Sequence, residues 1–595
     1  MTSFQKLMQL RQEMLKENID AFIIPKADEH QGEYVAPSAE RLLWLTGFNG
    51  SAGFSIILLE KAALFVDGRY TLQAAQQVDS SCFEIVPIAE VSGPTWLAQH
   101  LKPGAKLAYD SWLTTEREIQ GYKKTLGSNN IKFSPLEKNL VDQIWLDRPI
   151  KPSQPVYIHP LKFAGQDFRE KLTTIADELR KKQASASVVT MTESVGWLFN
   201  IRGSDYDFIP TTSAYAIIYD TGKADIFIDE QKVPNDVRQH FNALVTIKPF
   251  GSFEKTLQDL GQLQARVVID PFTTPVQAIY AVEKAGGEVL RCDEPTIHLK
   301  ACKNTAELEG MRRAHIRDGV ALTTFLYWIS HEGPKGNIDE LQAAAKILEY
   351  RQKFPEFKMP SFATISGTGP NGAIIHYRVS PETNRKIASN DIYLIDSGGH
   401  YIDGCTDVTR TISIGETTQE QRDRFTRVLK GHIGLATSIF PQGTSGSQLD
   451  ILARHALWQM GLDYAHGTGH GVGAALNIHE GPQRISNVPN YVSLKPGMIL
   501  SNEPGYYKEG AYGIRIENLV IVKSIDIPDA EKAMLGFETI TFAPIDLKLI
   551  DQALLTEVEI KWLNDYHQEV YHKLSSLLEP EVRDWLKETT RPLIT

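Results

Sequence analysis

The chain has 595 residues, of which 42% are hydrophobic and 23% are charged, and this is enough apolar material for several domains with complete cores. Its formal net charge of −11 argues against nucleic acid as a partner, because nucleic-acid-binding domains usually carry a basic face. The four cysteines show no pairing rhythm, which argues against a disulfide scaffold and favours a reducing compartment. No apolar run has the length of a membrane span or the pattern of a signal peptide, so we expect no membrane partner and a cytoplasmic location.

The N-terminal part alternates helices with strands. Residues 1–18 are amphipathic with a helical period and predict a helix. We expect a strand over residues 19–25, a hairpin over residues 54–67 and a helix over residues 71–77. This order predicts an α/β domain.

A proline-rich segment, residues 148–155, interrupts both helix and central strand and predicts a linker. The sequence after it repeats features of the sequence before it. ERLLWL at residues 40–45 matches ESVGWL at residues 193–198, and ALFVD at residues 63–67 matches ADIFID at residues 224–229. The repetition predicts two copies of one fold.

The character of the sequence changes near residue 300. Asn304 and Glu307 form a capping pattern at the start of a long amphipathic helix. Every candidate site residue lies after this helix. A final segment from about residue 531 contains a strand-like run at residues 537–542 and then a helical run at residues 556–571.

Two aspartates are expected to share one centre. Asp396 follows the apolar run of residues 392–395, so the chain leaves a buried strand with this carboxylate pointing inward. Asp407 begins the next strand-like run, in which polar Thr409 and Thr411 alternate with larger residues. We therefore expect the two aspartates on neighbouring strands of a hairpin.

Three further polar residues stand in β-like or glycine-rich sequence. His470 lies in GTGHGVG (467–473), Glu503 in SNEPGYY (501–507) and Glu517 in GIRIEN (513–518). Gathered in one place, four carboxylates would repel one another unless cations were bound, and this number of ligands suits two ions. The glycine-rich segment does not have dinucleotide-binding spacing, and no GxxxxGK[ST] occurs, so nucleotide binding is not expected.

The order Asp, Asp, His, Glu, Glu with these flanking residues resembles the two-metal site of the methionine aminopeptidase, prolidase and aminopeptidase P superfamily, whose catalytic domain has the pita-bread fold. The whole chain resembles three-domain aminopeptidase P (Xaa-Pro aminopeptidase). The resemblance implies an α/β (α+β) protein with two creatinase-like N-terminal domains, a pita-bread catalytic domain and a short C-terminal extension. We place these four parts at residues 1–150, 151–301, 302–528 and 529–595.

The resemblance also implies roles for the five ligands. Asp396 would bind one ion, His470 and Glu503 the other, and Asp407 and Glu517 both ions, with a water held between them. Oxygen ligands with one imidazole suit Mn²⁺, Fe²⁺, Co²⁺ or Zn²⁺, and the family favours two manganese ions. Glu503 would be both a ligand and the base that takes the proton of this water.

Four more residues are carried over from the resemblance. His376, His466 and His479 match positions that line the substrate pocket, where an imidazole could bind the substrate carbonyl, stabilise an oxyanion or donate a proton to the leaving nitrogen. Arg515, beside Glu517, is expected to pair with a ligand carboxylate.

The activity implied is that of a metallo-aminopeptidase, a hydrolase that cleaves between any N-terminal residue and a penultimate proline. Prolidase and methionine aminopeptidase share the ligands but usually have shorter chains, and creatinase lacks the metal site. A pita-bread scaffold used only for binding is the alternative from another class, and such proteins usually lose ligands. The resemblance further implies a homodimer.

Overall fold

The computed structural model describes residues 1–594, and of Ser128 only the backbone. The chain forms two compact units that meet between Ile297 and His298, so the predicted boundary near residue 150 falls inside the first unit. Among the described residues, no helix combines the length and the hydropathy that crossing a membrane requires.

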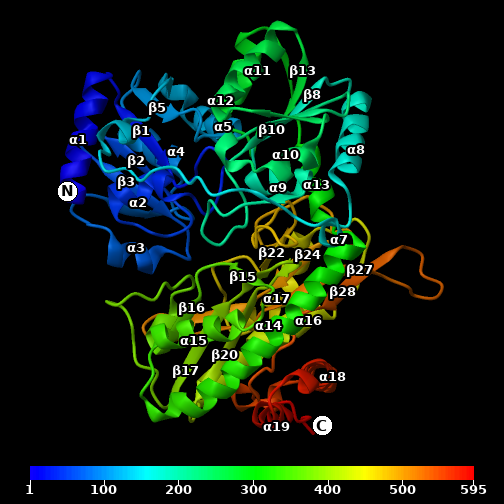
Figure 1. Ribbon diagram of the computed structural model, residues 1–595. Helices are drawn as coiled ribbons and strands as arrows, with labels where there is room; N and C mark the ends of the chain where they lie inside the picture. Colours follow the sequence, from blue (N-terminus) through cyan, green and yellow to red (C-terminus); the bar gives the residue numbers. More distant parts are fainter. Residues whose placement is uncertain (595) are drawn as a thin grey trace. The chain divides into compact units, whose positions relative to one another are not determined.

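The N-terminal unit contains two six-stranded sheets with the same topology (Figure 1). The first has the order β4-β3-β2-β1-β5-β6 and the second β12-β11-β10-β8-β13-β14. In each sheet three central strands are antiparallel and the outer pairings are parallel. The strands are β1 (Ala21–Pro25), β2 (Phe54–Leu58), β3 (Ala62–Val66), β4 (Glu84–Pro87), β5 (Lys106–Asp110), β6 (Lys132–Leu136), β8 (Ala186–Val189), β10 (Tyr215–Tyr219), β11 (Ala224–Phe227), β12 (Val245–Lys248), β13 (Arg266–Ile269) and β14 (Glu288–Arg291).

The predicted duplication is confirmed by this shared topology. The repeated motifs occupy equivalent elements, since ALFVD lies at β3 and ADIFID at β11, while the two tryptophan motifs fall at α2 (Arg41–Thr46) and α9 (Thr192–Phe199). The predicted hairpin is β2–β3, and the predicted helices are α1 (Ser3–Lys16) and α3 (Thr71–Gln77). Alternating buried positions supply apolar cores on both faces of the first sheet and the core that contains Ile217 and Val267 on the second.

The two copies contact each other through equivalent segments. The chain after β5 (Asp110 to Thr115) corresponds to the chain after β13 (Asp270 to Pro275). Gln277 N donates to the Ser111 carbonyl at 3.0 Å, and Arg117 N donates to the Pro271 carbonyl at 3.0 Å. Thr115 forms a β-bridge with Pro275. The same surface is therefore used on both sides, as in a two-fold interface between identical subunits.

The C-terminal unit begins with α14 (Thr305–Glu332), the long green helix of Figure 1. Asn304 and Glu307 form the predicted capping box, which fixes where this helix starts. The two antiparallel sheets that carry most of the site have the orders β16-β17-β20 and β21-β28-β27-β24, and smaller antiparallel sheets lie beside them in the chain. Their strands are β16 (Ile365–Thr368), β17 (Asp391–Ser397), β20 (Val408–Ile414), β21 (Phe440–Pro441), β24 (Ile499–Asn502), β27 (Asn518–Ile525) and β28 (Met534–Thr539).

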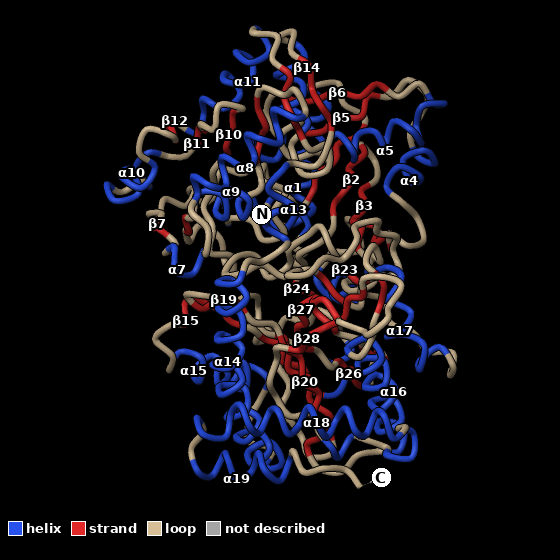
Figure 2. Tube along the Cα trace, turned by 90° about the vertical axis from the view of Figure 1, so that its right-hand side faces the viewer, coloured by secondary structure: helices blue, strands red, loops and turns tan. Residues whose placement is uncertain are grey.

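Helices pack against these sheets and enclose the apolar core of the unit. α16 (Gln419–Ala436) and α17 (Gly446–Trp458) pack against each other, and α15 (Glu340–Gln352) packs against α14. α18 (Glu557–Leu574) and α19 (Pro580–Thr589) form the C-terminal segment, and α18 lies beside β20 in Figure 2. Buried residues of α16 and α18 share one apolar cluster with Ile514 of β26 (Tyr512–Arg515). The strand ends in this unit therefore have a rigid backing.

Candidate metal centre

Three carboxylates meet at the ends of neighbouring strands. Asp396 lies in β17, Asp407 immediately precedes β20, and Glu517 immediately precedes β27. Thr409 Oγ1 donates to Glu517 Oε2 at 2.8 Å, and Glu517 N donates to the Thr409 carbonyl at 3.2 Å. One carboxylate oxygen from each of the three acids lies within 4.8 Å of the other two. These acids can therefore bind a common ion.

Asp396 and Asp407 belong to adjacent antiparallel strands, with Asp396 opposite Thr409. The prediction of neighbouring strands is confirmed, but the prediction of a hairpin is wrong, because β18 (Gly399–Tyr401) and β19 (Gly404–Cys405) lie between them in the chain and pair in another sheet. The backbones meet closely at Gly398, where a Cβ would lie 1.9 Å from the Thr406 carbonyl oxygen. Glycine is needed there for the chain to leave the sheet.

His470 and Glu503 approach the same centre from two further strands. His470 ends the short strand β22 (Gly469–His470), and Glu503 follows β24. His470 Nε2 lies 3.4 Å from Asp407 Oδ2 and 3.7 Å from Glu503 Oε1. Ligand atoms of His470, Glu503 and Glu517 lie within 4.8 Å of one another. All five residues expected as ligands are thus brought together.

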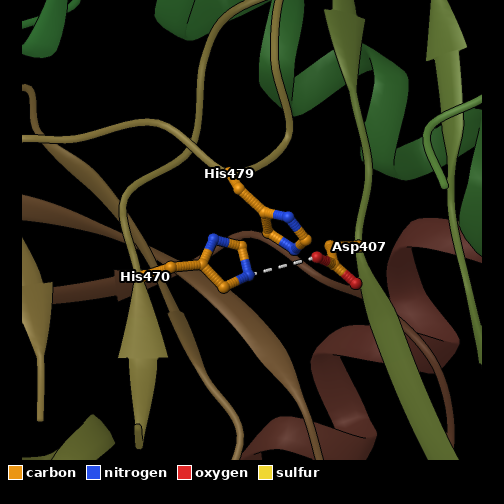
Figure 3. A group of neighbouring side chains, drawn as sticks. All are labelled: Asp407, His470 and His479. Atoms are coloured by element: carbon orange, nitrogen blue, oxygen red, sulfur yellow. Dashed lines mark ion pairs between the residues drawn. The ribbon is translucent and has the colours of Figure 1, made fainter. Parts of the chain in front are cut away.

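His479 also lies at this centre. Its ring and the His470 ring are nearly perpendicular, with centroids 4.4 Å apart, and both rings point toward Asp407 in Figure 3. Ligand atoms of Asp407, His470 and His479 form a third group within 4.8 Å. The sequence placed His479 only in the substrate pocket, whereas the structure brings it within reach of an ion.

The electrostatics of the cluster favour bound cations. Burial raises the pKa of Asp396 to about 7, although Arg515 opposes this. Burial, and then the charges of Asp407 and Asp396, raise the pKa of Glu517 well above its usual range. Burial disfavours a charged His470, but the hydrogen bond to Asp407 and the charge of Glu503 raise its pKa to about 9. Divalent cations would replace these protons, and the oxygen-rich donor set fits them.

The hydrogen bonding of Asp396 also fits a bound cation. The residue is 7% exposed, and within residues 1–594 its Oδ1 atom is buried without a hydrogen-bond partner. Its Oδ2 atom accepts a hydrogen bond of 2.6 Å from Arg515 Nη2. A buried carboxylate oxygen with no donor is costly, and a metal ion would satisfy it.

Tyr507 joins Arg515 to His466, a role that the sequence did not reveal. Arg515 Nη1 donates to Tyr507 Oη at 2.6 Å, and His466 Nε2 lies 3.0 Å from the same oxygen. His466 Nδ1 lies 4.0 Å from Glu503 Oε2. The only signal for Tyr507 in the sequence is its position four residues after Glu503, in β25 (Gly505–Lys508).

His376 lies on the loop after β16. It belongs to none of the three ligand groups found among the described residues, but Arg515 Nη1 lies 3.5 Å from the carbonyl oxygen of the preceding Ile375. Glu340, which is fully buried, fixes this loop by accepting hydrogen bonds from Thr368 N at 2.7 Å and Tyr377 Oη at 3.0 Å. The loop of His376 is thus anchored next to the cluster.

Sequence comparison agrees with this architecture. The model of metallopeptidase family M24 matches residues 309–524, which include the whole cluster. Two models of the creatinase/prolidase N-terminal domain match residues 6–144 and 147–307, and the C-terminal region of peptidase M24 matches residues 533–593. A protein of Ajellomyces dermatitidis named probable Xaa-Pro aminopeptidase P is 41% identical, with 99% of each chain covered. The chain belongs to metallopeptidase family M24, in the group of the Xaa-Pro aminopeptidase P proteins.

Other members of this group show the same relationship over the full length. The probable Xaa-Pro aminopeptidase P of Coprinopsis cinerea is 42% identical, with 99% of this chain and 98% of the relative covered. The solved X-prolyl aminopeptidase of Caenorhabditis elegans, a cytosolic enzyme with a di-nuclear active site, superposes with a TM-score of 0.95 at 34% identity and covers 100% of both chains. The predicted family, the fold of two creatinase-like domains with a pita-bread domain, and the class of enzyme are confirmed.

Proposed function

We propose that this M24 enzyme releases the N-terminal residue from peptides whose second residue is proline, with two divalent metal ions bound at the cluster. The observation that carries the proposal is the convergence of four carboxylates and His470 in overlapping groups of three, each with its ligand atoms within 4.8 Å of one another. Relatives that match this chain over its full length are named for this activity, which supports the proposal.

The ligand groups suggest how the ions are shared. Asp407, Glu517 and His470 each occur in two of the three groups. A carboxylate has two oxygens and can bind one ion with each, whereas Nδ1 of His470 lies 2.9 Å from the Gly471 carbonyl oxygen and leaves only Nε2 for a metal. This supports a bridging role for Asp407 and Glu517. Asp396 would then hold one ion, and His470 with Glu503 the other. The donors suit several divalent metals. Manganese is our choice from the family resemblance, and metal analysis of the purified protein would test it.

Bound ions would activate a water molecule at neutral pH and polarise the scissile carbonyl. The side chains of this protein then handle protons. Glu503, whose pKa burial raises, is placed to accept a proton at its carboxylate. His466, linked to Tyr507, and the nearby His479 and His376 are candidates to bind the substrate carbonyl or to protonate the leaving nitrogen.

Proline makes that last step distinctive. The scissile bond is a tertiary amide without an N–H, so a pocket gains nothing from an acceptor aimed at that nitrogen. The fixed ring instead allows selection by shape and apolar contact, and the departing secondary amine must receive a proton. A free substrate α-amine is expected near a metal ion or a carboxylate of the cluster.

Peptide hydrolysis tests the proposal directly. Manganese-loaded enzyme should cleave Xaa-Pro-Yaa after the first residue, cleave Xaa-Ala-Yaa poorly and leave acetylated Xaa-Pro-Yaa intact. Cleavage of dipeptides alone would indicate a prolidase, and preference for Met-Ala over Met-Pro would indicate a methionine aminopeptidase. No hydrolysis with or without chelator would favour a scaffold used for binding.

We also propose a homodimer formed through α17. Exposed apolar side chains gather along this helix and just beyond it, where Ile451 is 49% exposed, Trp458 43% and Met460 50%. Such a patch commonly marks an interface. Sedimentation analysis should show a dimer for the native protein and a monomer for Ile451→Glu, whereas Val558→Glu, an exposed position on α18, should remain dimeric.

A cytoplasmic location completes the proposal. The four cysteines are all unpaired in the structure, and the worm relative is a cytosolic enzyme. Fractionation of cells that express the protein would test this. The domain boundaries at residues 150, 301 and 528 stay predictions.

A further inference from the structure

A buried polar layer lies directly behind the proposed metal ligands. Its members are Arg410, His432, Asn502, Asn518 and Tyr566, and each is 5% exposed or less. Asn502 precedes Glu503, Asn518 follows Glu517, and Arg410 is three residues after Asp407. The strands β20, β24 and β27, each next to a proposed ligand, therefore contribute one member each to the polar layer.

Hydrogen bonds to His432 of α16 join the members of the polar layer on β24 and β27. Asn502 and Asn518 are paired residues of β24 and β27. Asn502 Nδ2 donates to the His432 carbonyl at 2.9 Å, and Asn518 Nδ2 lies 3.2 Å from His432 Nε2. The strands that carry Glu503 and Glu517 are thus held in register by side chains as well as by the sheet.

Arg410 is the charged member of the polar layer. Its Nη1 donates to the carbonyl oxygen of Glu517 at 2.7 Å, and its Nη2 lies 2.8 Å from both Asn518 Oδ1 and Tyr566 Oη. In the described part of the chain, no carboxylate is among its hydrogen-bond partners. A buried guanidinium without a paired anion is unfavourable unless opposite charge is close. The carboxylate whose charge acts on Arg410 is that of Glu517, so Arg410 offsets part of the repulsion within the acidic cluster.

Tyr566 connects this arginine to the C-terminal segment. It lies on α18, within the match to the C-terminal region of peptidase M24. Its hydroxyl lies 2.8 Å from Arg410 Nη2 and donates to the Thr541 carbonyl at 3.0 Å. Its neighbour His567 is also buried, but it accepts a hydrogen bond from Ile545 N at 3.0 Å instead.

We propose that Tyr566 is a positioning residue for the metal centre, which holds Arg410 against the carbonyl of Glu517 and so makes the C-terminal segment part of the metal-binding machinery. This inference rests on the proposed role of Glu517 as a ligand. Residues that hold ligands in place typically change metal affinity by about 10- to 100-fold when altered. Without the Tyr566 hydroxyl, Arg410 has one hydrogen-bond partner fewer. Its guanidinium is then held less firmly against the Glu517 carbonyl and the Asn518 side chain.

The experiment compares Tyr566→Phe with two matched controls in the full-length protein. His567→Phe removes a buried polar contact of the same helix without touching Arg410. Tyr327→Phe removes a hydroxyl that contacts Glu581 of α19 at the surface. Each protein is stripped of metal, equilibrated with buffered free Mn²⁺ and analysed for bound manganese and for thermal unfolding.

Tyr566→Phe should bind at least one Mn²⁺ ion about tenfold more weakly than the native protein, and excess Mn²⁺ should restore most of its activity. The two controls should keep native affinity even where His567→Phe lowers the unfolding temperature. Native affinity in Tyr566→Phe, or equal weakening in Tyr566→Phe and His567→Phe, would overturn the inference. A native protein that bound neither Mn²⁺ nor Zn²⁺ would contradict the proposed function itself. Native affinity in Tyr566→Phe would contradict only this inference, so the two failures are distinguishable.

Discussion

Arg515 donates a hydrogen bond of 2.6 Å from its Nη2 atom to Asp396 Oδ2. The guanidinium thereby restrains one carboxylate oxygen and leaves Oδ1 for another partner. The same side chain contacts Tyr507 through Nη1 and Thr409 through Nε. One buried cation therefore organises an acid, a tyrosine and the threonine that supports Glu517.

Replacing either bridging candidate should abolish activity. Asp407→Ala or Glu517→Ala removes a charge shared by two cations, which then repel each other with less negative charge between them. Metal content should fall from two ions per chain toward one or none, measured by elemental analysis. Two bound ions with native turnover would exclude the altered residue as a bridge.

Glu503→Gln should preserve the fold and remove most activity. The amide can neither accept a proton nor supply the charge of a carboxylate, and a positioned base contributes about 10²–10⁴-fold. Steady-state kinetics at saturating Mn²⁺ would measure this loss. A variant with more than about a tenth of the native kcat would contradict the role as base.

Tyr507→Phe should lower kcat/KM by about tenfold or more while metal content stays native. The hydroxyl joins Arg515 to His466, and a hydrogen bond to a charged group contributes about 1.5–3 kcal/mol. Tyr506→Phe is the matched control, because this half-buried neighbour packs against Tyr512 rather than the cluster. Equal kinetics for the two variants would show that the Tyr507 hydroxyl is dispensable.

Acid should destabilise the C-terminal unit partly through His567. Burial lowers the pKa of His567 to about 3, against about 6.5 in an unfolded chain. The contribution of neutral His567 to the free energy of unfolding is fully present above pH ~6.5. It decreases by about 1.4 kcal/mol per pH unit as the pH falls from 6.5 toward 3. Between pH 6.5 and 5, the free energy of unfolding of His567→Phe should therefore fall by about 2 kcal/mol less than that of the native protein.

Denaturant unfolding of both proteins at each pH would measure this difference. The variant is expected to be less stable at pH 7, because Ile545 N loses its acceptor. The difference in the free energy of unfolding between the two proteins should become smaller as the pH falls. Parallel stability curves would show that His567 takes up its proton in the folded state as easily as in the unfolded chain.

Local features of the sequence predicted much of the fold. The capping pattern of Asn304 and Glu307, the β2–β3 hairpin and the repeated tryptophan motifs depend on neighbouring residues, and the structure contains all of them. The hairpin between Asp396 and Asp407 was wrong because β18 pairs with a distant strand, β15 (Phe357–Pro360), and β19 then pairs with β18. No local signal encodes that pairing.

By itself, the sequence determined which residue types are available and in what order: two aspartates, a histidine and two glutamates in buried or glycine-rich surroundings, with the family that this order indicates. The tertiary structure alone decided which atoms meet. Asp396 and Glu517 are linked by hydrogen bonds through Arg515 and Thr409, and a ring nitrogen of His479 lies within 4.8 Å of ligand atoms of Asp407 and His470. Tyr507 and Tyr566 acquire their roles from long-range packing. Hydrogen bonds and charge interactions depend on the distance between atoms in space, and the periodicity of a sequence does not indicate that distance.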